Sequence, residues 1–424
     1  MSGLEFTMEK KNYNIQIIGA GISGLIAAQT LENAGFSPTI IESSESVGGR
    51  VKTDLVDGYQ LDHGFQVLLS SYPAAQKFLD YEALELQNFI PGASIFSNGK
   101  ENQIGDPLRD FSLLFPTMFS SLIPLNDKIK ILQLNLKLKA KSIADIFNEE
   151  EKTTLHYLKD FGFSDQVISQ FFKPFFSGIF LETKLETSSR MFEFVYKMFG
   201  TGNAALPKAG IQAIPNQLAR KLKTTKILFN TKVKSVQNGS ITLENGQVLE
   251  TDFTIIATDS SQLLSNLKKE TLNWKSCVTL YFETEKRVIA KPLIGLLPAK
   301  NTVINNIFYH TSLKTSVHAD KELLSVTVVD HQNLKGEELV DQVKSELKVH
   351  FNIEVIRLIK QYETAKALPD LKNLKYSLSP IETQHSNQIF LAGDTLLNGS
   401  LNAAMLSGES AALAVTKASG KIEK

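Results

Sequence analysis

The stretch from Tyr13 to Glu42 constrains the fold more than any other part of the chain. An apolar run over 13–18 leads into Gly19-Ala20-Gly21-Ile22-Ser23-Gly24, a helical pattern follows, and a second apolar run ends at Glu42. Strand, glycine turn, helix and strand in this order, with an acid about 20 residues after the turn, predict a βαβ unit that binds a dinucleotide.

Each residue of this turn has a mechanical reason to be there. Gly19 permits the tight turn, Gly21 lets a pyrophosphate approach the backbone, and Gly24 lets the helix pack closely on the sheet. Ile22 and Ser23 place free N–H groups at the helix N-terminus, where the dipole favours phosphate. Glu42 is expected to accept from both ribose hydroxyls; it would serve FAD or NAD equally, and its charge would repel a 2′-phosphate.

Composition bounds the class of protein. The chain has 424 residues with 45 basic and 45 acidic side chains, which allows two or three domains and argues against nucleic acid as a partner. The single cysteine, Cys277, suits a reducing cytoplasm, and the polar start at 1–12 contains no signal-peptide pattern. We therefore expect a cytoplasmic protein, with peripheral membrane contact left as an open alternative.

Further glycine-rich segments follow along the chain. Gly48-Gly49-Arg50 would allow close backbone approach and supply a phosphate-binding guanidinium, the alternative being a surface ion pair for Arg50. Asp62-His63-Gly64-Phe65 comes next, and a strand near the C-terminus ends in Gly393-Asp394. Ser400 is a plausible cap for the helix that begins at Leu401-Asn402.

With these motifs in this order, the chain resembles the superfamily of FAD-dependent amine oxidases, carotenoid (phytoene) desaturases and protoporphyrinogen oxidases. The resemblance spans nearly the whole chain, and the run 400–408 is most similar to the desaturase-like branch. It implies that FAD is the cofactor. It places Gly48, Gly49 and Arg50 along the pyrophosphate and flavin, Gly64 and Phe65 near the isoalloxazine, Val233 at the adenine through its backbone, and Gly393, Asp394, Leu401 and Asn402 around the ribityl chain and the flavin pyrimidine edge.

The fold class that follows is α/β, a doubly wound Rossmann-type FAD-binding domain with an inserted α+β substrate domain. The FAD-binding domain is expected to be discontinuous, and the first part of the substrate domain to be mostly helical and its second part to contain a sheet. The expected boundaries are 1–75, 204–270 and 375–424 for the FAD-binding domain, and 76–203 and 271–374 for the substrate domain.

Several local elements can be predicted from pattern alone. Tyr72-Pro73 opens an expected helix to Leu86. Over 128–141 the leucines alternate as in a strand, but lysine and leucine are good helix formers, so a helix is predicted there. The other expected elements are a strand over 227–236, hairpin turns at Asn238-Gly239 and Asn245-Gly246, strands over 277–282 and 323–329, and a helix over 337–349.

Phenylalanine is abundant, with 26 residues, many of them between Phe111 and Phe199. An ordinary helical core and an apolar substrate cavity both explain this composition. The uncharged stretch 111–125 is too short to span a bilayer. A proline-kinked buried helix, a contact with the membrane interface and a channel to the flavin all remain open for it.

No catalytic side chain or metal site emerges from the pattern. His63 could act as an acid or base beside the flavin, but a packing role is simpler. Several amine oxidases hold a water near the flavin with a lysine on a strand; here the expected register places Thr279 at that position, with Lys275 four residues earlier on the same face. The missing lysine argues against amine oxidation and leaves Lys275 as a weak candidate.

The desaturase-like resemblance implies hydride abstraction from a C–H bond of a hydrophobic, isoprenoid-like or other apolar substrate to flavin N5. One dinucleotide fingerprint and no Cys-x4-Cys pair exclude a built-in NAD(P)H domain or disulfide relay, so oxygen, a quinone or another diffusible acceptor would take the electrons. The alternatives are an amine oxidase that releases peroxide, a redox-neutral flavin-dependent isomerase, and a flavin-stabilised protein that carries a lipid.

Overall fold

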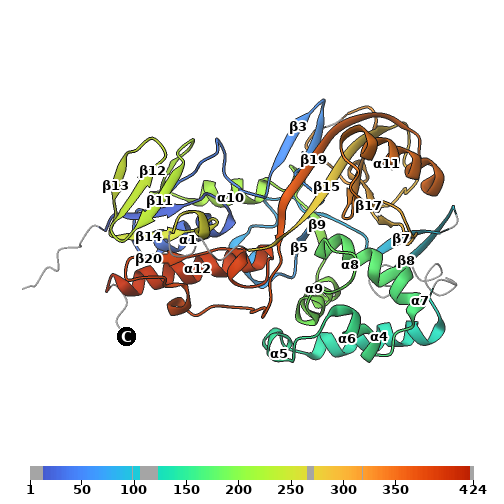
Figure 1. Cartoon of the computed structure of the whole chain (residues 1–424), viewed down its shortest axis with the longest axis horizontal. Helices are drawn as coiled ribbons and strands as arrows, with labels where there is room; N and C mark the ends of the chain where they lie inside the picture. The colour runs from blue at the N-terminus through green and yellow to red at the C-terminus, as the bar shows by residue number, and fades with distance from the viewer. Residues whose placement is uncertain (1–12, 98, 106–122, 265–271, 318, 421–424) are drawn as a thin grey trace, which may run out of the picture.

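The computed structural model describes residues 13–97, 99–105, 123–264, 272–317 and 319–420 of the chain. Most of the uncharged stretch 111–125 lies outside these residues, so its interpretation stays a prediction. Figure 1 shows a parallel-sheet region at the left, a group of helices at the lower right and a large sheet at the upper right.

The parallel sheet has the strand order β10-β2-β1-β14-β20, and every neighbouring pair in it is parallel. Its central strands β1 and β14 are buried throughout, as strands covered on both faces must be. The predicted α/β fold with a Rossmann-type sheet is confirmed. The strands are β1 (Ile15–Ile18), β2 (Thr39–Ile41), β10 (Lys226–Leu228), β14 (Phe253–Ile256) and β20 (Ile389–Leu391).

Helix α1 (Ile22–Asn33), near the start of the chain, and helix α12 (Leu401–Ala418), near its end, pack against each other beside this sheet. They approach so closely that a Cβ on Gly408 would lie 2.2 Å from the carbonyl oxygen of Ser23. A Cβ on Gly24 would lie 2.0 Å from the carbonyl oxygen of Gly19, which is the close helix packing expected of the third glycine.

A three-stranded antiparallel meander follows the parallel sheet, and it corrects one prediction. The single strand expected over 227–236 is two strands: β10 joins the parallel sheet, and β11 begins the meander. Asn230 adopts a left-handed conformation with φ 51°, which asparagine tolerates, and so turns the chain between them. The hairpin turns at Gly239 and Gly246 are confirmed. The meander comprises β11 (Val233–Gln237), β12 (Ser240–Leu243) and β13 (Val248–Glu250).

The large sheet has seven strands in the order β19-β15-β18-β17-β16-β7-β8, with one parallel pair, β16 and β7. Helix α11 (Gly336–Phe351) packs its apolar side against this sheet, and the helix and the sheet form one hydrophobic core. The predicted strands over 277–282 and 323–329 and the helix over 337–349 are confirmed. The strands are β7 (Gly92–Ser97), β8 (Lys100–Gly105), β15 (Trp274–Thr284), β16 (Ile294–Leu296), β17 (Ile304–Tyr309), β18 (Glu322–Val328) and β19 (Val355–Pro369).

Helix α4, in the group of helices, confirms the helix expected over 128–141. A π-helical turn, η2, directly precedes α8, because Pro174 has no N–H to continue the regular ladder. The elements are α4 (Leu125–Ala140), α5 (Ile143–Asn148), α6 (Thr154–Asp160), α7 (Asp165–Val167), η2 (Ile168–Phe172), α8 (Lys173–Phe180) and α9 (Ser189–Thr201).

The helix expected from Tyr72 to Leu86 is much shorter, because α2 (Pro73–Phe78) ends where Asp80 begins a turn. The Asp80 carboxylate accepts from the N–H of Ala83, and Glu85 then takes a positive φ of 48°. The remaining elements are β3 (Thr53–Val56) paired with β4 (Tyr59–Asp62), the small sheet of β5 (Leu68–Leu69), β9 (Ala204–Leu206) and β6 (Gln87–Asn88), helix α10 (Ala213–Lys221), and short 3-10 turns η3 (Ser260–Gln262), η4 (His310–Ser312), η5 (Pro380–Thr383) and η6 (Asp394–Leu396).

The two large sheets each draw on separated stretches of sequence. The parallel sheet uses residues from 15 to 41, 226 to 256 and 389 to 391, whereas the seven-stranded sheet uses 92 to 105 and 274 to 369. The division into two discontinuous domains at the stated boundaries stays a prediction.

Candidate functional site

One continuous cavity of about 2390 Å³ runs from the carboxyl ends of β1 and β2 to helices α8 and α9. Ligand pockets commonly measure about 300–1,000 Å³, so this volume can hold a dinucleotide and a second molecule. Of the residues that the sequence assigned to the cofactor, those that line the cavity are Gly19, Gly21, Ile22, Ser23, Glu42, Gly48, Gly49, Arg50, Gly64, Phe65, Val233, Gly393, Asp394 and Leu401.

The glycine turn at the start of α1 has the shape that a phosphate requires. Helix α1 begins after Gly21 with no side-chain cap, so its first N–H groups face the cavity end unpaired by any side chain. A Cβ on Gly21 would meet no atom within 4 Å, which shows open space directly over this backbone. Gly19 takes a positive φ of 101°, as the tight turn demands. These observations fit the pyrophosphate of FAD.

Glu42 is buried at the tip of β2 and is already held by the protein. One carboxylate oxygen accepts from the N–H of Ala20 at 2.7 Å, and the other accepts from the N–H and hydroxyl of Ser44 at 2.8 Å each and from the hydroxyl of Ser43 at 3.3 Å. Each carboxylate oxygen has about two lone-pair sites, so the oxygen bound to Ala20 retains one for a ribose hydroxyl. The same bonds fix the glycine turn against the second strand.

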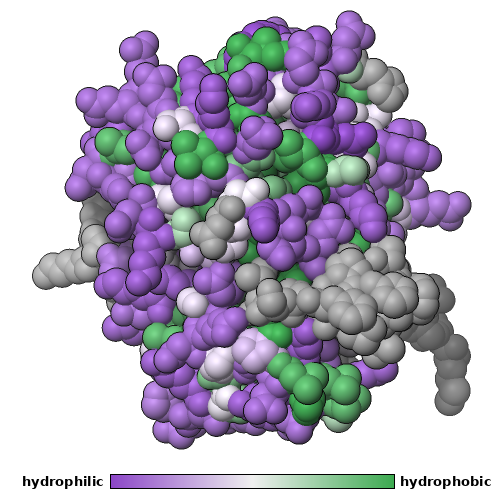
Figure 2. Space-filling view, turned by 90° about the vertical axis from the view of Figure 1, so that its right-hand side faces the viewer, coloured by the Kyte–Doolittle hydropathy of each residue, from purple (hydrophilic) through white to green (hydrophobic). Residues whose placement is uncertain are grey.

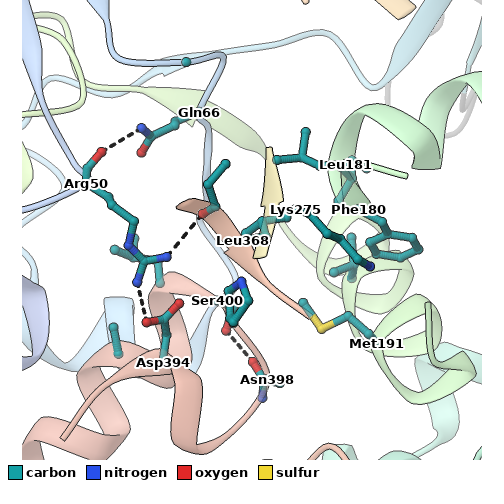
Figure 3. A pocket seen from close by; sticks show the side chains of 18 of the residues that line it. Arg50, Gln66, Phe180, Leu181, Met191, Lys275, Leu368, Asp394, Asn398 and Ser400 are labelled. Atoms are coloured by element: carbon teal, nitrogen blue, oxygen red, sulfur yellow. Dashed lines mark hydrogen bonds and ion pairs between the residues drawn. The ribbon is translucent and has the colours of Figure 1, made fainter. Parts of the chain in front are cut away.

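Arg50 and Asp394 form an ion pair across the cavity, as Figure 3 shows. Arg50 also donates to the carbonyl oxygen of Ala367 at 3.2 Å, and its guanidinium lies 5.3 Å from the centre of the Trp274 ring. Arg50 therefore forms an ion pair, as the alternative predicted, and its partner is Asp394; the role of both residues toward the cofactor stays a prediction. Trp274 lines the same cavity, and no sequence motif pointed to it.

The start of α12 agrees with the expected cap. Ser400 accepts from the N–H of Ala403 at 3.0 Å and donates to Asn398 at 2.6 Å (Figure 3). Leu401 lines the cavity, but Asn402 does not: its side chain is fully buried and accepts from the N–H of Ala74 on α2 at 3.0 Å. Gly24 is also absent from the lining, since it packs against Gly19.

His63 lines the cavity, and its ring packs against that of Tyr362 with the ring centres 4.5 Å apart and the planes tilted by 30°. Its Nε2 lies 3.0 Å from a carboxylate oxygen of Asp54, on the antiparallel pair β3–β4. This arrangement favours the packing role over acid–base chemistry for His63.

A small second cavity is lined by two buried titratable residues, Asp62 and His310. Burial raises the pKa of Asp62 to about 6, although Thr53 and the N–H of Ile211 donate to its carboxylate. Burial lowers the pKa of His310 to about 4, and its Nε2 lies 3.1 Å from the hydroxyl of Ser325. Sequence pattern alone gave no sign of His310.

The far end of the cavity is an aromatic wall. Phe175 and Phe176 on α8 face it, and their rings stand 5.3 Å apart at nearly right angles. The other apolar residues of this wall are Phe171, Ile179, Phe180, Leu181, Met191, Val195, Tyr196 and Phe199. Some of the abundant phenylalanine rings therefore fill the core and others line the cavity, and its use for an apolar substrate stays a prediction.

Lys275 extends into the cavity beside Phe180 and Met191 (Figure 3). Its Nζ lies 3.0 Å from the hydroxyl of Thr187 and 3.6 Å from the carboxylate of Asp370. Thr279, which the expected register placed nearest the flavin, is buried and does not line the cavity. The next residue of the same face, Cys277, does line it, and burial raises its pKa to about 11.

Within the part of the chain that the structure describes, no cluster of His, Cys, Asp and Glu could hold a metal ion. No described helix is both long enough and apolar enough to cross a membrane.

The sequence matches the family model of flavin-containing amine oxidoreductases over residues 22–416. Among curated proteins, coproporphyrinogen III oxidase of Bacillus subtilis is 24% identical over 293 residues, which is 57% of this chain and 59% of that protein. The chain thus spans less than two thirds of this relative's length.

Solved structures share the fold. The structure of a putative protoporphyrinogen oxidase from Exiguobacterium superposes with a TM-score of 0.69 at 18% identity, covering 95% of this chain and 98% of the other. Putrescine oxidase bound to putrescine superposes with a TM-score of 0.69 at 16% identity, covering 96% and 99%.

Proposed function

Because this chain belongs to the family of flavin-containing amine oxidoreductases and is a FAD-dependent oxidoreductase, we propose that it oxidises an apolar small molecule at a C–H bond. FAD, when bound, supplies the acceptor for the hydride that leaves that carbon. The observation that carries the proposal is the continuity of one cavity from the glycine turn at Gly21 to the aromatic wall on α8 and α9.

The cofactor end would hold FAD mainly through backbone. Uncapped N–H groups after Gly21 suit the pyrophosphate, and Glu42 suits the adenosine ribose. Arg50, whose charge Asp394 balances, would lie along the phosphates and flavin. We assign the remaining predicted residues that line this end, from Gly48 to Leu401, to the same cofactor.

The substrate end supports an apolar ligand through two features. The wall of phenylalanine, methionine and tyrosine side chains would exclude water and orient a hydrophobic body by shape. Lys275 lies at this end with the Asp370 carboxylate 3.6 Å away, so the two charges offset one another and the pair adds no net negative charge to attract a protonated amine.

Amine oxidation is the second candidate, and one observation favours it. Lys275 lines the cavity, although the sequence register had placed Thr279 at the expected lysine position. The carboxylate of Asp370, 3.6 Å from Lys275 Nζ, could also offset the repulsion of an amine.

Anaerobic titration of the FAD-loaded protein would separate the two candidates. We expect an isoprenoid-rich lipid fraction to bleach the visible flavin absorbance and a panel of amines to leave it unchanged. Oxygen and a soluble quinone would then be compared as acceptors that restore the absorbance. Bleaching by amines alone would overturn the proposal in favour of amine oxidation.

A matched pair of variants would tie the reaction to the aromatic wall. Met191→Asp places a carboxylate in the substrate end, so we expect KM for the apolar substrate to rise about tenfold or more. Leu55→Asp adds the same charge at a side chain that is 71% exposed on β3, and it should leave KM unchanged. Equal effects of the two variants would contradict the assignment of this wall.

A further inference from the structure

Helix α4 has two apolar sides, and only one of them is used in packing. Leu134 and Leu138 are buried against the rest of the molecule. On the opposite side, four large apolar side chains face solvent: Leu125 is 73% exposed, Ile129 49%, Leu132 49% and Leu136 61%.

The spacing of these four residues makes them one continuous stripe. Positions i, i+4, i+7 and i+11 fall on a single face of a helix with 3.6 residues per turn. Single exposed apolar residues are normal on protein surfaces, but a contiguous apolar patch marks a site of contact. Figure 2 shows an apolar patch at its lower right, on the part of the molecule where Figure 1 places α4.

Lysines border this stripe on one side, where helical periodicity places Lys128 and Lys139. Lys130 and Lys137 turn back toward the protein: Lys130 donates to the carbonyl oxygen of Gly162, and Lys137 Nζ lies 3.5 Å from the carboxylate of Glu193. The one acidic residue of α4, Asp127, is buried and accepts from the N–H and hydroxyl of Ser164. The outward surface of α4 therefore combines apolar side chains with positive charge and carries no carboxylate of its own.

This combination of apolar and positively charged side chains favours one binding partner for α4, an anionic bilayer. An amphipathic helix with leucines on one face and lysines beside them lies at the interface of an anionic bilayer, where the leucines enter the acyl boundary and the lysines reach headgroup phosphates. A second copy of the chain fits less well, because α4 packed on α4 would bring lysine flanks together.

The same helix also borders the cavity. Its residues Lys128, Ile131, Leu132 and Asn135 line the substrate end. Leu132 contributes to both surfaces, since it is half-exposed and also lines the cavity. An apolar molecule dissolved in a bilayer under α4 would thus lie next to residues that line the cavity.

We infer that α4 is a membrane-docking helix, which seats the substrate end of the cavity on an anionic phospholipid surface. The docking itself does not depend on the proposed reaction. Its use for delivering an apolar substrate does rest on that proposed function.

The test is flotation of the full chain with vesicles of phosphatidylcholine containing about one third phosphatidylglycerol, and with vesicles of phosphatidylcholine alone. We expect strong binding to the anionic vesicles and weak binding to the neutral ones. The combined variant Leu125→Gln, Ile129→Gln and Leu136→Gln, whose positions do not line the cavity, should lower the binding about tenfold or more.

Two further variants separate the contributions. Lys128→Gln with Lys139→Gln removes the charged flank and should weaken binding mainly at low salt. The control is Leu55→Gln, Val349→Gln and Ile381→Gln, three residues that are 67–71% exposed elsewhere on the molecule, and it should bind like the wild type. Thermal melts of all variants should match the wild type, because none of these side chains is buried.

Three results would overturn the inference: no binding of the wild type to anionic vesicles, equal binding of the wild type and the α4 variant, or self-association that the α4 variant abolishes while vesicle binding persists. Vesicle binding needs no turnover, so failure here is distinguishable from failure of the proposed oxidation. The α4 variant should still oxidise a detergent-solubilised substrate at the wild-type rate.

Discussion

The two ends of the cavity are built by different means. The cofactor end consists of short sequence motifs whose backbone does most of the work, from the glycine turn before α1 to the cap of α12 at Ser400. The substrate end consists of side chains from η2, α8, α9 and β15, which are up to about a hundred residues apart. Backbone geometry at one end tolerates few changes, whereas the aromatic wall at the other can be altered residue by residue.

The ends also differ in how their polar groups are satisfied. At the cofactor end, Glu42 is held by backbone N–H groups, so the site has its shape before a ligand arrives. At the substrate end, polar side chains such as Lys275, Thr187 and Glu186 line the cavity beside the aromatic wall, and the helices behind the wall are joined by a buried ion pair between Glu193 and Lys141. The following predictions, from the largest expected effect to the smallest, test whether this contrast is correct.

The largest effect should come from the glycine turn. Gly24→Ala places a Cβ 2.0 Å from the carbonyl oxygen of Gly19, so the helix must move away from the sheet. We expect the free energy of unfolding to fall by about 3 kcal/mol or more, with loss of FAD binding. Denaturant unfolding and flavin content would measure both.

Gly21→Ala is the matched control for this prediction. A Cβ at Gly21 meets nothing within 4 Å in the protein, so the apoprotein should unfold like the wild type. The methyl group would still occupy space proposed for the pyrophosphate, so FAD affinity should fall about tenfold or more. Normal FAD affinity in Gly21→Ala would refute the assignment of this turn.

The buried ion pair behind the aromatic wall should come next. Glu193 is 1% exposed, pairs with Lys141, and accepts from the hydroxyl of Tyr157 at 2.6 Å. Glu193→Ala leaves Lys141 with the half-exposed Glu149, 2.6 Å away, and removes the acceptor of Tyr157, which should cost up to about 3 kcal/mol of unfolding free energy.

An exposed pair provides the comparison. Glu409 pairs with Lys77, whose side chain is 56% exposed, so Glu409→Ala should cost less than about 1 kcal/mol. Equal losses for the two variants, measured by urea unfolding, would show that helix packing rather than the ion pair holds the substrate end.

The third prediction concerns the pH dependence of stability that Asp62 and His310, at the small second cavity, give to the fold. The folded pKa of Asp62, about 6, lies above its ordinary value of 3.8, so between these pH values the folded state binds more protons and stability falls as pH rises. His310 acts in the opposite sense, because its folded pKa of about 4 lies below 6.5 and stability rises with pH in that window.

Asp62→Asn removes one of these opposing effects and keeps an oxygen that can accept from Thr53 and Ile211. The free energy of unfolding of the variant, relative to the wild type, should therefore increase by about 2 kcal/mol between pH 4 and pH 6. Urea unfolding at a series of pH values measures this difference. A constant difference would mean that Asp62 does not titrate as the buried site requires.

The smallest effect is expected at the ribose position. Glu42→Gln keeps one acceptor oxygen but replaces the other with a donor that faces an N–H group. FAD affinity, followed by flavin fluorescence, should fall about tenfold. Glu45→Gln changes an exposed neighbour outside the cavity lining and should have no effect. Unchanged affinity in Glu42→Gln would remove Glu42 from the ribose site.

Sequence reasoning worked best where function depends on local backbone. The turn at Gly19, the close packing of Gly24, the cap at Ser400 and the meander turns at Gly239 and Gly246 are all found as expected. These features depend on residues close together in sequence, so a pattern of residue types is enough to predict them.

Sequence reasoning failed where a local irregularity interrupts the pattern of residue types. The expected register placed Thr279 nearest the flavin, but Thr279 is buried outside the cavity lining, whereas Lys275 and Cys277 of the same face line it. Asn230 divides one expected strand into two sheets, and the turn at Asp80 ends a helix that the pattern extended to Leu86. These last two errors each arose from a local conformation that residue type permits but does not require.

The sequence by itself determined the family, the FAD cofactor and the Rossmann-type fold, because the dinucleotide fingerprint is a contiguous backbone device. The tertiary structure alone decided that Lys275 enters the cavity, that Trp274 lies under Arg50, and that α4 leaves an apolar stripe exposed. Such juxtapositions depend on how distant segments pack, and packing is set by the whole fold rather than by any one segment.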